Sequence, residues 1–126
     1  MQIIIAGSRE FRSYPTLVRV CHHYLQNIPN PVIVCGHARG TDQLALRYAK
    51  KYNLPINSFY PNWAKYGKAA GYIRNQQMAR HGQALLVFWN GTSPGTKSMV
   101  QLAKKQQLPI RVFYFNQLFQ TLGQPF

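Results

Sequence analysis

The residues best suited to chemistry lie in a glycine-rich turn at positions 36–42, with the sequence GHARGTD. Its glycines allow backbone N–H groups to approach an anion, and the helix expected to follow adds the partial positive charge of its N-terminus. Asp42 is one of only two acidic residues in the chain, and it could accept hydrogen bonds from ribose hydroxyl groups. A simpler interpretation is that Thr41 and Asp42 cap this helix. The two roles are compatible, and the sequence leaves both open.

Three other segments carry similar residues, and each follows an apolar stretch that is typical of a buried strand. They lie at 7–10, 61–75 and 90–97. Because ligands of open α/β sheets bind beyond the carboxyl ends of the strands, these loops predict one shared anion site. The residues expected to contact a phosphate or another part of the ligand are Gly7, Ser8, Arg9, Gly36, Arg39, Gly40, Thr41, Arg74, Asn75, Gly91, Gly95, Thr96 and Lys97.

The two acids and one aromatic residue complete the candidate site. Asp42 and Glu10 are candidates for ribose binding or for catalysis, and the alternative for Glu10 is an ion pair with an arginine. Trp63 is a candidate for stacking on a base, because aromatic residues alternate with lysines around it. The alternative is that these aromatic residues belong to the core or to an interface.

Strands and helices alternate along the chain and must position these loops. Apolar stretches predict strands at 2–6, 32–35, 56–60, 84–89 and 110–115. Helical spacing and caps predict helices at 13–28, 42–52, 72–80 and 96–107, with an irregular stretch at 61–71 and a tail at 116–126. Such alternation predicts parallel βαβ units, and uniformly apolar strands predict a sheet covered on both faces. We therefore expect one doubly wound α/β domain with about five strands, mainly parallel.

The charge balance limits the possible functions. Lys and Arg total 15 against two acids, a formal net charge of +13. Such a field attracts nucleic acid or a phosphorylated ligand, although a generally basic surface that maintains solubility is the alternative.

Two acids cannot build a carboxylate cage for Mg²⁺ or Ca²⁺, and the Cys and His residues lack the paired spacing of a zinc site. We expect no metal and no cofactor.

Other features concern the compartment. Cys21 and Cys35 fall in core-like patterns, which is typical of reduced thiols in a cytosolic protein. The apolar runs are much shorter than the about 20 residues that span a bilayer, and no signal peptide is recognisable. We expect a cytoplasmic protein without membrane contact.

The segment 91–98, GTSPGTKS, is similar to the phosphate-binding P-loop pattern and lies between an expected strand and helix. Thr96 replaces the second glycine of that pattern, however, and no Asp ends another strand to help hold Mg²⁺. These departures argue against a P-loop ATPase and favour a phosphate-contacting turn without metal.

Taken together, the chain resembles the SLOG superfamily of Rossmann-like nucleotide-binding domains, and within it the cpYpsA-related, YspA-like branch. The resemblance implies a Rossmann-like three-layer sandwich over residues 1–126, binding of a nucleotide or an ADP-ribose-like ligand, and a homo-oligomer, a dimer or higher. The matching segments are 7–11, 35–42, 61–63 with Gly67 and Gly71, Arg74 and Asn75 with Met78, 88–91, and 95–97.

Relatives of the "lonely guy" type are phosphoribohydrolases with the motif P-G-G-x-G-T-x-x-E and a partnered R-K-x-x-M. Here Asn75 stands in place of the lysine, and Met99 in place of the glutamate. A thioether cannot replace a catalytic carboxylate. One alternative to simple binding is a nucleotide N-glycosidase in which Asp42 or Glu10 replaces the glutamate. Another is nucleic-acid binding, motivated by the charge and by the resemblance of the superfamily to DNA-processing protein A.

Overall fold

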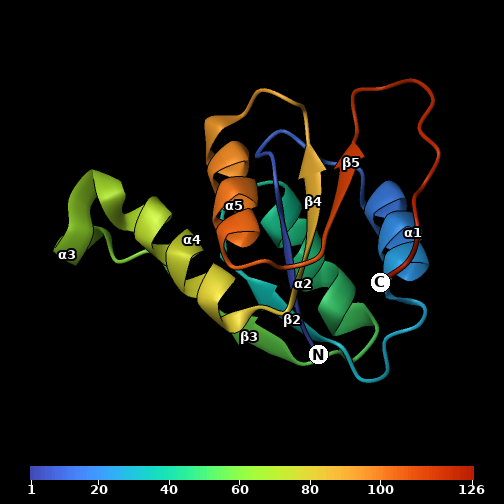
Figure 1. Ribbon diagram of the computed structural model, residues 1–126, viewed down its shortest axis with the longest axis horizontal. Coiled ribbons are helices and arrows are strands. Elements are labelled where there is room, and N and C mark those ends of the chain that lie inside the picture. Colours follow the sequence, from blue (N-terminus) through green and yellow to red (C-terminus); the bar gives the residue numbers. More distant parts are fainter.

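The five strands form one parallel sheet in the order β3-β2-β1-β4-β5 (Figure 1). The computed structural model describes all residues, 1–126. In the register of the sheet, Ile3 lies opposite Ile33 on one side and Ala84 on the other. The expectation of a mainly parallel, five-stranded sheet is confirmed. The strands are β1 (Gln2–Gly7), β2 (Val32–Cys35), β3 (Ile56–Ser58), β4 (Ala84–Trp89) and β5 (Ile110–Tyr114).

Helices cover both faces of this sheet and make three layers. Helices α1 (Tyr14–Leu25) and α2 (Thr41–Lys51) pack on one face. Helices α4 (Ala70–His81) and α5 (Pro94–Lys105) pack on the other. The doubly wound, Rossmann-like sandwich is thereby confirmed.

Alternation along β1 shows why the strands are apolar throughout. Ile3 and Ile5 are fully buried against α1 and α2, whereas Ile4 and Ala6 are buried against α4 and α5. Side chains of successive strand residues point to opposite faces, so a sheet with two covered faces needs both sets to be apolar.

The helix ends follow from local sequence, with one correction. Helix α1 begins as expected, because the Ser13 side chain accepts a hydrogen bond from the Thr16 N–H and a proline occupies its first turn. The expectation that Thr41 and Asp42 cap α2 through their side chains is wrong. The N-cap is Gly40, which makes no side-chain cap, and both residues already lie inside the helix.

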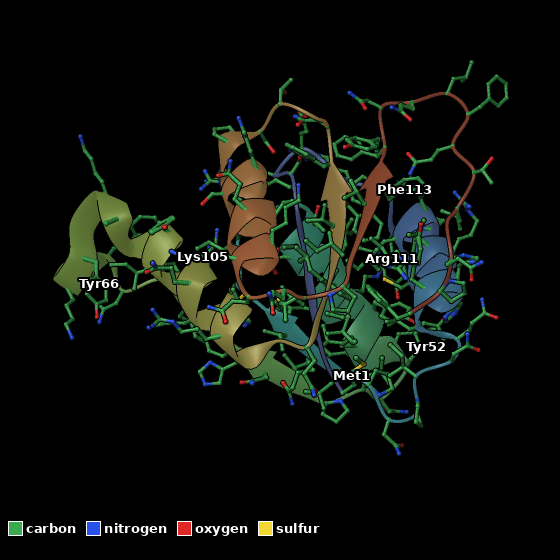
Figure 2. The ribbon with its side chains drawn as sticks, in the orientation of Figure 1. Met1, Tyr52, Tyr66, Lys105, Arg111 and Phe113 are labelled. Carbon is green, nitrogen blue, oxygen red and sulfur yellow. The ribbon has the colours of Figure 1, made fainter.

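The stretch expected to be irregular, 61–71, contains a short helix α3 (Trp63–Tyr66), a 3-10 turn η1 (Gly67–Ala69) and the first two residues of α4. The Asn62 side chain starts α3 by accepting a hydrogen bond from the Lys65 N–H. This segment, here called the arm (residues 61–71), projects away from the sheet, and Tyr66 lies on it in Figure 2.

The tail folds back on α1. The Phe126 N–H donates to the carbonyl of Tyr24 at 3.0 Å, and the two rings are in contact.

Both cysteines are free and buried, in line with the expectation of core thiols. Among the helices, none has the length and apolar character needed to cross a bilayer.

Candidate functional site

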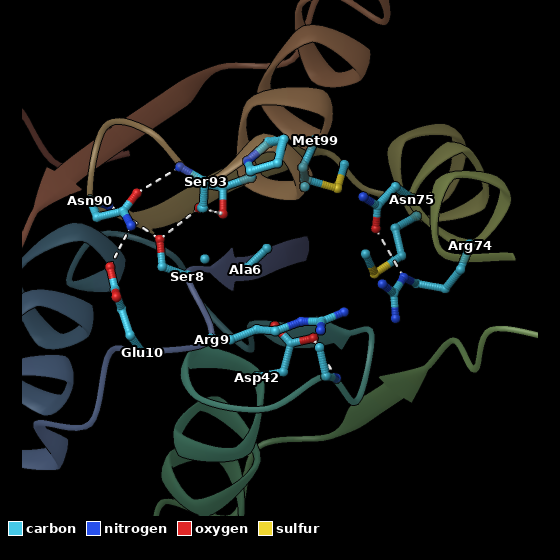
Figure 3. Close-up of a pocket in the computed structure, with 16 residues that line it drawn as sticks. Ala6, Ser8, Arg9, Glu10, Asp42, Arg74, Asn75, Asn90, Ser93 and Met99 are labelled. Carbon is cyan, nitrogen blue, oxygen red and sulfur yellow. Dashed lines mark hydrogen bonds between the residues drawn. The ribbon is translucent and has the colours of Figure 1, made fainter. Parts of the chain in front are cut away.

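The strand order defines where a ligand should bind. From β1 the chain builds one side of the sheet through β2 and β3, and then returns to add β4 and β5 on the other side. The loops after the neighbouring strands β1 and β4 therefore diverge, which opens a crevice at their carboxyl ends. A cavity of about 490 Å³ lies there, here called the central cavity (Figure 3). Its lining residues are 6–10, Ala38, Asp42, Arg74, Asn75, Met78, Asn90, 93–96 and Met99.

The N-terminus of α5 forms one wall of the central cavity. Its N-cap residue, Ser93, makes no side-chain capping hydrogen bond to the first turn, and Pro94 has no N–H to donate. The N–H groups of Gly95 and Thr96 therefore lack that usual partner, and the helix dipole adds partial positive charge at the same place. This wall is suited to an anion.

A network of hydroxyl and amide groups connects this wall with the loop after β1. The Oγ atoms of Ser8 and Ser93 lie 2.9 Å apart, and Ser93 Oγ lies at the same distance from Thr96 Oγ1. The Asn90 backbone N–H donates to Ser8 Oγ at 3.2 Å, while Asn90 Oδ1 accepts from the Ser93 N–H at 2.8 Å. The network orients polar groups at the cavity without adding negative charge.

Two arginines face this wall across the cavity. In Figure 3 the guanidinium groups of Arg9 and Arg74 point toward one another. Arg74 is half-buried, donating to the carbonyl of Gly36 and, from Nε, to Asn75 Oδ1 at 2.9 Å. Burial lowers the pKa of Arg74, yet a guanidinium stays protonated in proteins. The cavity therefore has fixed positive charge on two sides.

Two glycines of the 36–42 turn make room for these arginines. A Cβ on Gly36 would lie 2.9 Å from Arg74 Nη1. Gly40 has φ +71°, and a Cβ there would lie 2.3 Å from the carbonyl oxygen of Arg9. Neither glycine lines the central cavity. Their place in the structure shows that they allow the loops carrying the arginines to approach, which differs from the backbone cradle expected from the sequence.

Asp42 is the buried carboxylate of the site, with 5 % of its surface exposed. Its Oδ2 accepts a hydrogen bond from the Ala38 N–H at 2.8 Å. Burial raises the pKa of Asp42 to about 6, and the Ala38 hydrogen bond and the charges of Arg74 and Arg9 oppose that rise. Since the carboxyl group lines the cavity, it can exchange a proton near neutral pH or accept hydrogen bonds from a ligand.

The second acid and two methionines complete the lining. Glu10 accepts a hydrogen bond from Asn90 Nδ2 and lies at the open side of the cavity. Met78 and Met99 are buried and contribute thioether surface. Met99, at the position of the glutamate in the phosphoribohydrolase motif, is thus part of the cavity wall.

A second cavity of about 420 Å³ adjoins the first and is here called the outer cavity. It lies between the 36–42 turn and the arm. The exposed side chains of Arg39 and Trp63 line it. Its complete lining is Arg9, His37, Ala38, Arg39, Pro61, Trp63 and Arg74.

The structure brings together most, but not all, of the residues expected from the sequence. Nine of them line the central cavity: Gly7, Ser8, Arg9, Glu10, Asp42, Arg74, Asn75, Gly95 and Thr96.

The other expected residues lie elsewhere. Arg39 and Trp63 line only the outer cavity. Thr41 is buried outside both cavities and donates to the carbonyl of Ser8 at 3.0 Å. Lys97 is exposed on the first turn of α5 and lines neither cavity, so the expected meeting of Arg39, Arg74 and Lys97 does not occur. Gly36, Gly40 and Gly91 also lie outside both linings.

Some residues of the site lie in the segments singled out from the sequence but were not named there as contacts. Asn90 and Ser93 hold the polar network, and His37 and Pro61 line the outer cavity. The position of Asn90 directly after the apolar strand 84–89 was the available signal for that residue. No group of three or more His, Cys, Asp or Glu side chains is placed to hold a metal ion.

Fold and site together define a doubly wound α/β domain with an anion-suited cavity at the switch point of its sheet. The chain belongs to the YspA, cpYpsA-related SLOG family, YAcAr, whose family model matches residues 1–66. It is similar to the Gene 61 protein of Mycobacterium phage D29, with 32 % identity over 116 residues, which covers 86 % of this chain and 93 % of the relative.

Solved structures of DNA processing protein A share the fold at low sequence identity. The protein from Streptococcus pneumoniae superposes with a TM-score of 0.69 and 17 % identity, covering 88 % of this chain and 49 % of its own. This chain therefore spans about half the length of that protein. The protein from Helicobacter pylori, which binds single-stranded DNA, superposes with a TM-score of 0.67 and 19 % identity, covering 93 % of this chain and 67 % of its own.

Proposed function

We propose that the protein binds a nucleotide or a nucleotide-derived, ADP-ribose-like ligand in the central cavity. The proposal is carried by one observation. The N-terminus of α5, which has no side-chain cap, lines the cavity together with Arg9 and Arg74 on the facing walls. Helix N-termini and arginines are the usual protein partners of phosphate. Membership of the SLOG family supports nucleotide or nucleic-acid binding in general.

In this proposal the phosphate contacts come from Arg9, Arg74 and the N–H groups of Gly95 and Thr96. The Ser8 and Ser93 hydroxyls supply neutral hydrogen bonds at the same wall. Asp42 accepts hydrogen bonds from ribose hydroxyl groups, as acidic residues do in dinucleotide-binding folds.

Calorimetric titration with AMP, ADP, ATP and ADP-ribose tests the proposal. Arg9 is exposed and makes no side-chain hydrogen bond that holds the fold, so Arg9→Ala should leave folding intact. Loss of a charge-assisted hydrogen bond, worth about 1.5–3 kcal/mol, should weaken binding about 10- to 150-fold. Lys97→Ala removes the same charge outside the cavity and should change the Kd less than twofold. If none of the four compounds binds, or if Arg9→Ala and Lys97→Ala behave alike, the proposal is wrong.

Hydrolysis of the N-glycosidic bond is the second candidate, because a buried acid with a pKa of about 6 lines the cavity. Because Met99 stands where the phosphoribohydrolase motif has its glutamate, Asp42 and Glu10 are the only carboxyl groups that line the cavity. Incubation with a set of nucleoside monophosphates, followed by chromatography for free base, decides the matter. The enzyme would be established if the protein releases free base faster than a protein-free blank and if Asp42→Asn abolishes this release.

Nucleic-acid binding is the third candidate, favoured by the basic and aromatic arm, where Trp63, Lys65 and Lys68 are exposed, and by the exposed Tyr60 directly before it. A protein that contacts 6–10 phosphates loses about 10³- to 10⁵-fold in affinity between 50 and 200 mM salt. A titration of single-stranded DNA across that range would support this candidate if the loss is of that size, and would exclude it if binding is absent at 50 mM.

A further inference from the structure

The two cavities are not separate, because they share part of their walls. Arg9, Ala38 and Arg74 line both of them. The guanidinium groups of Arg9 and Arg74 point toward one another in Figure 3, and burial, together with repulsion by the charge of Arg9, lowers the pKa of Arg74. An anion placed between them would relieve this repulsion while in contact with both cavities.

The outer cavity presents chemistry that differs from that of the central one. It has no carboxylate in its lining, and it offers the guanidinium of Arg39 and the indole of Trp63. Trp63 is 56 % exposed, which leaves much of its indole ring open to a second ring. Gly71 lies between Trp63 and Arg74, since a Cβ there would be 3.9 Å from the indole and 3.8 Å from Arg74 Nη2. The aromatic surface and the central cation are thus neighbours.

One wall of the outer cavity is held in an unusual conformation. His37 has φ +62°, and its ring stacks on Tyr60 with centroids 4.1 Å apart and planes 16° apart. This stacking ties the 36–42 turn to the residue directly before the arm, and Arg39 and Trp63 line the same cavity. A non-glycine residue with positive φ persists where the surrounding structure determines it, and such positions cluster at binding sites.

From these observations we infer that a single two-part ligand occupies both cavities, with a pyrophosphate bridge at Arg9 and Arg74. One nucleoside lies in the central cavity, and a second sugar or base lies in the outer cavity against Trp63. The two charges of a pyrophosphate match the two guanidinium groups, and about 490 and about 420 Å³ together fall within the usual range of roughly 300–1,000 Å³ for ligand sites. The inference rests on the proposed function and names its ligand class as pyrophosphate-linked dinucleotides.

The test compares ligands that fill one cavity or both. AMP fills the central cavity alone, whereas diadenosine diphosphate reaches both, and a 5′-phosphorylated 3′,5′-linked adenosine dinucleotide has the same two bases with a different bridge. Calorimetry should show that diadenosine diphosphate binds at least tenfold tighter than AMP. Trp63→Ala should weaken its binding about 5- to 100-fold, the effect of losing one base–aromatic stack, and leave the Kd for AMP unchanged.

Tyr72→Ala is the matched control, because Tyr72 is an equally exposed aromatic residue, at 51 %, that lines neither cavity. It should leave the Kd values for all three compounds unchanged. The inference is overturned if diadenosine diphosphate binds no tighter than AMP, or if Trp63→Ala acts equally on both. If only the 3′,5′-linked dinucleotide depends on Trp63, the pyrophosphate bridge is wrong and the site accepts a nucleic-acid strand. If AMP and both dinucleotides fail to bind, the proposed function fails together with the inference.

Discussion

The central and outer cavities adjoin each other but are built differently. The central cavity lies between loops whose residues are buried, such as Ser8, Asp42 and Thr96, and Ser8 joins the loops after β1 and β4 through hydrogen bonds with Ser93 and Asn90. The outer cavity owes its character to the exposed side chains of Arg39 and Trp63. The fold itself therefore positions the proposed anion site, whereas the surrounding loops determine which further groups a ligand can carry. Changes of the buried residues of the central cavity should therefore affect folding and binding together, whereas changes of exposed residues such as Arg39 and Trp63 should affect only the choice of ligand.

The largest effect is expected from Gly40→Ala. An alanine there would combine a positive φ with a contact of 2.3 Å to the carbonyl oxygen of Arg9. Strain of about 1–3 kcal/mol and a similar cost of overpacking should lower the free energy of unfolding by about 2–6 kcal/mol. Denaturant titration measures this.

Gly95→Ala is its control, because a Cβ on Gly95 meets no atom within 4 Å and alanine is the better helix former. It should leave the stability equal or slightly higher. Equal stability of the two variants would show that the loops after β1 and β2 do not depend on their close contact.

A smaller effect concerns the protonation of Asp42. Burial raises the pKa of Asp42 from 3.8 to about 6, so the folded protein holds a proton between these values that the unfolded chain releases. Stability from this group is therefore complete below pH 4 and is lost as the pH rises through 6, by roughly 2–3 kcal/mol at about 1.4 kcal/mol per pKa unit.

Asp42→Asn removes this dependence, so the unfolding free energy of the parent should fall by roughly 2–3 kcal/mol relative to that of the variant as the pH rises from 4 to 7.5. Chemical denaturation at five pH values measures the difference. A constant difference across the range would mean that Asp42 ionises normally and is not buried as described.

The smallest effect is expected at the outer cavity. Arg39 is exposed, and exposed ionic contacts are worth about 0.2–1 kcal/mol. Arg39→Ala should therefore weaken the binding of ADP-ribose about 1.4- to 5-fold and leave both the affinity for AMP and the free energy of unfolding unchanged. Competition titration resolves such a change. An equal loss of affinity for AMP would mean that Arg39 contacts the phosphate in the central cavity, and that the two cavities do not bind different parts of the ligand.

Sequence reasoning predicted the fold well because its signals are local. Apolar strands such as 84–89 and the Ser13 cap of α1 each depend on a few adjacent residues. The edge of the sheet that carries the site was also predictable, since the unusual residues follow the strands. The arm was not, because its helical turns begin at an Asn62 cap within a segment rich in turn residues.

Details of the site depended on contacts between distant loops, which no local pattern reports. The two glycines of the 36–42 turn suggested a backbone cradle, whereas in the structure both leave space for the segments that carry Arg9 and Arg74. Lys97 is on the expected helix turn, but its direction on α5 takes it out of the cavity. The strand order places Ser8 beside Asn90, 82 residues apart, and only the fold reveals that pair.

A crystal structure of the protein grown with ADP-ribose would show where the phosphate groups of the ligand bind. We predict electron density for phosphate between Arg9, Arg74 and the first turn of α5, with one ribose next to Asp42. Phosphate density bound at Lys97 or along the arm, with the central cavity empty, would contradict the account.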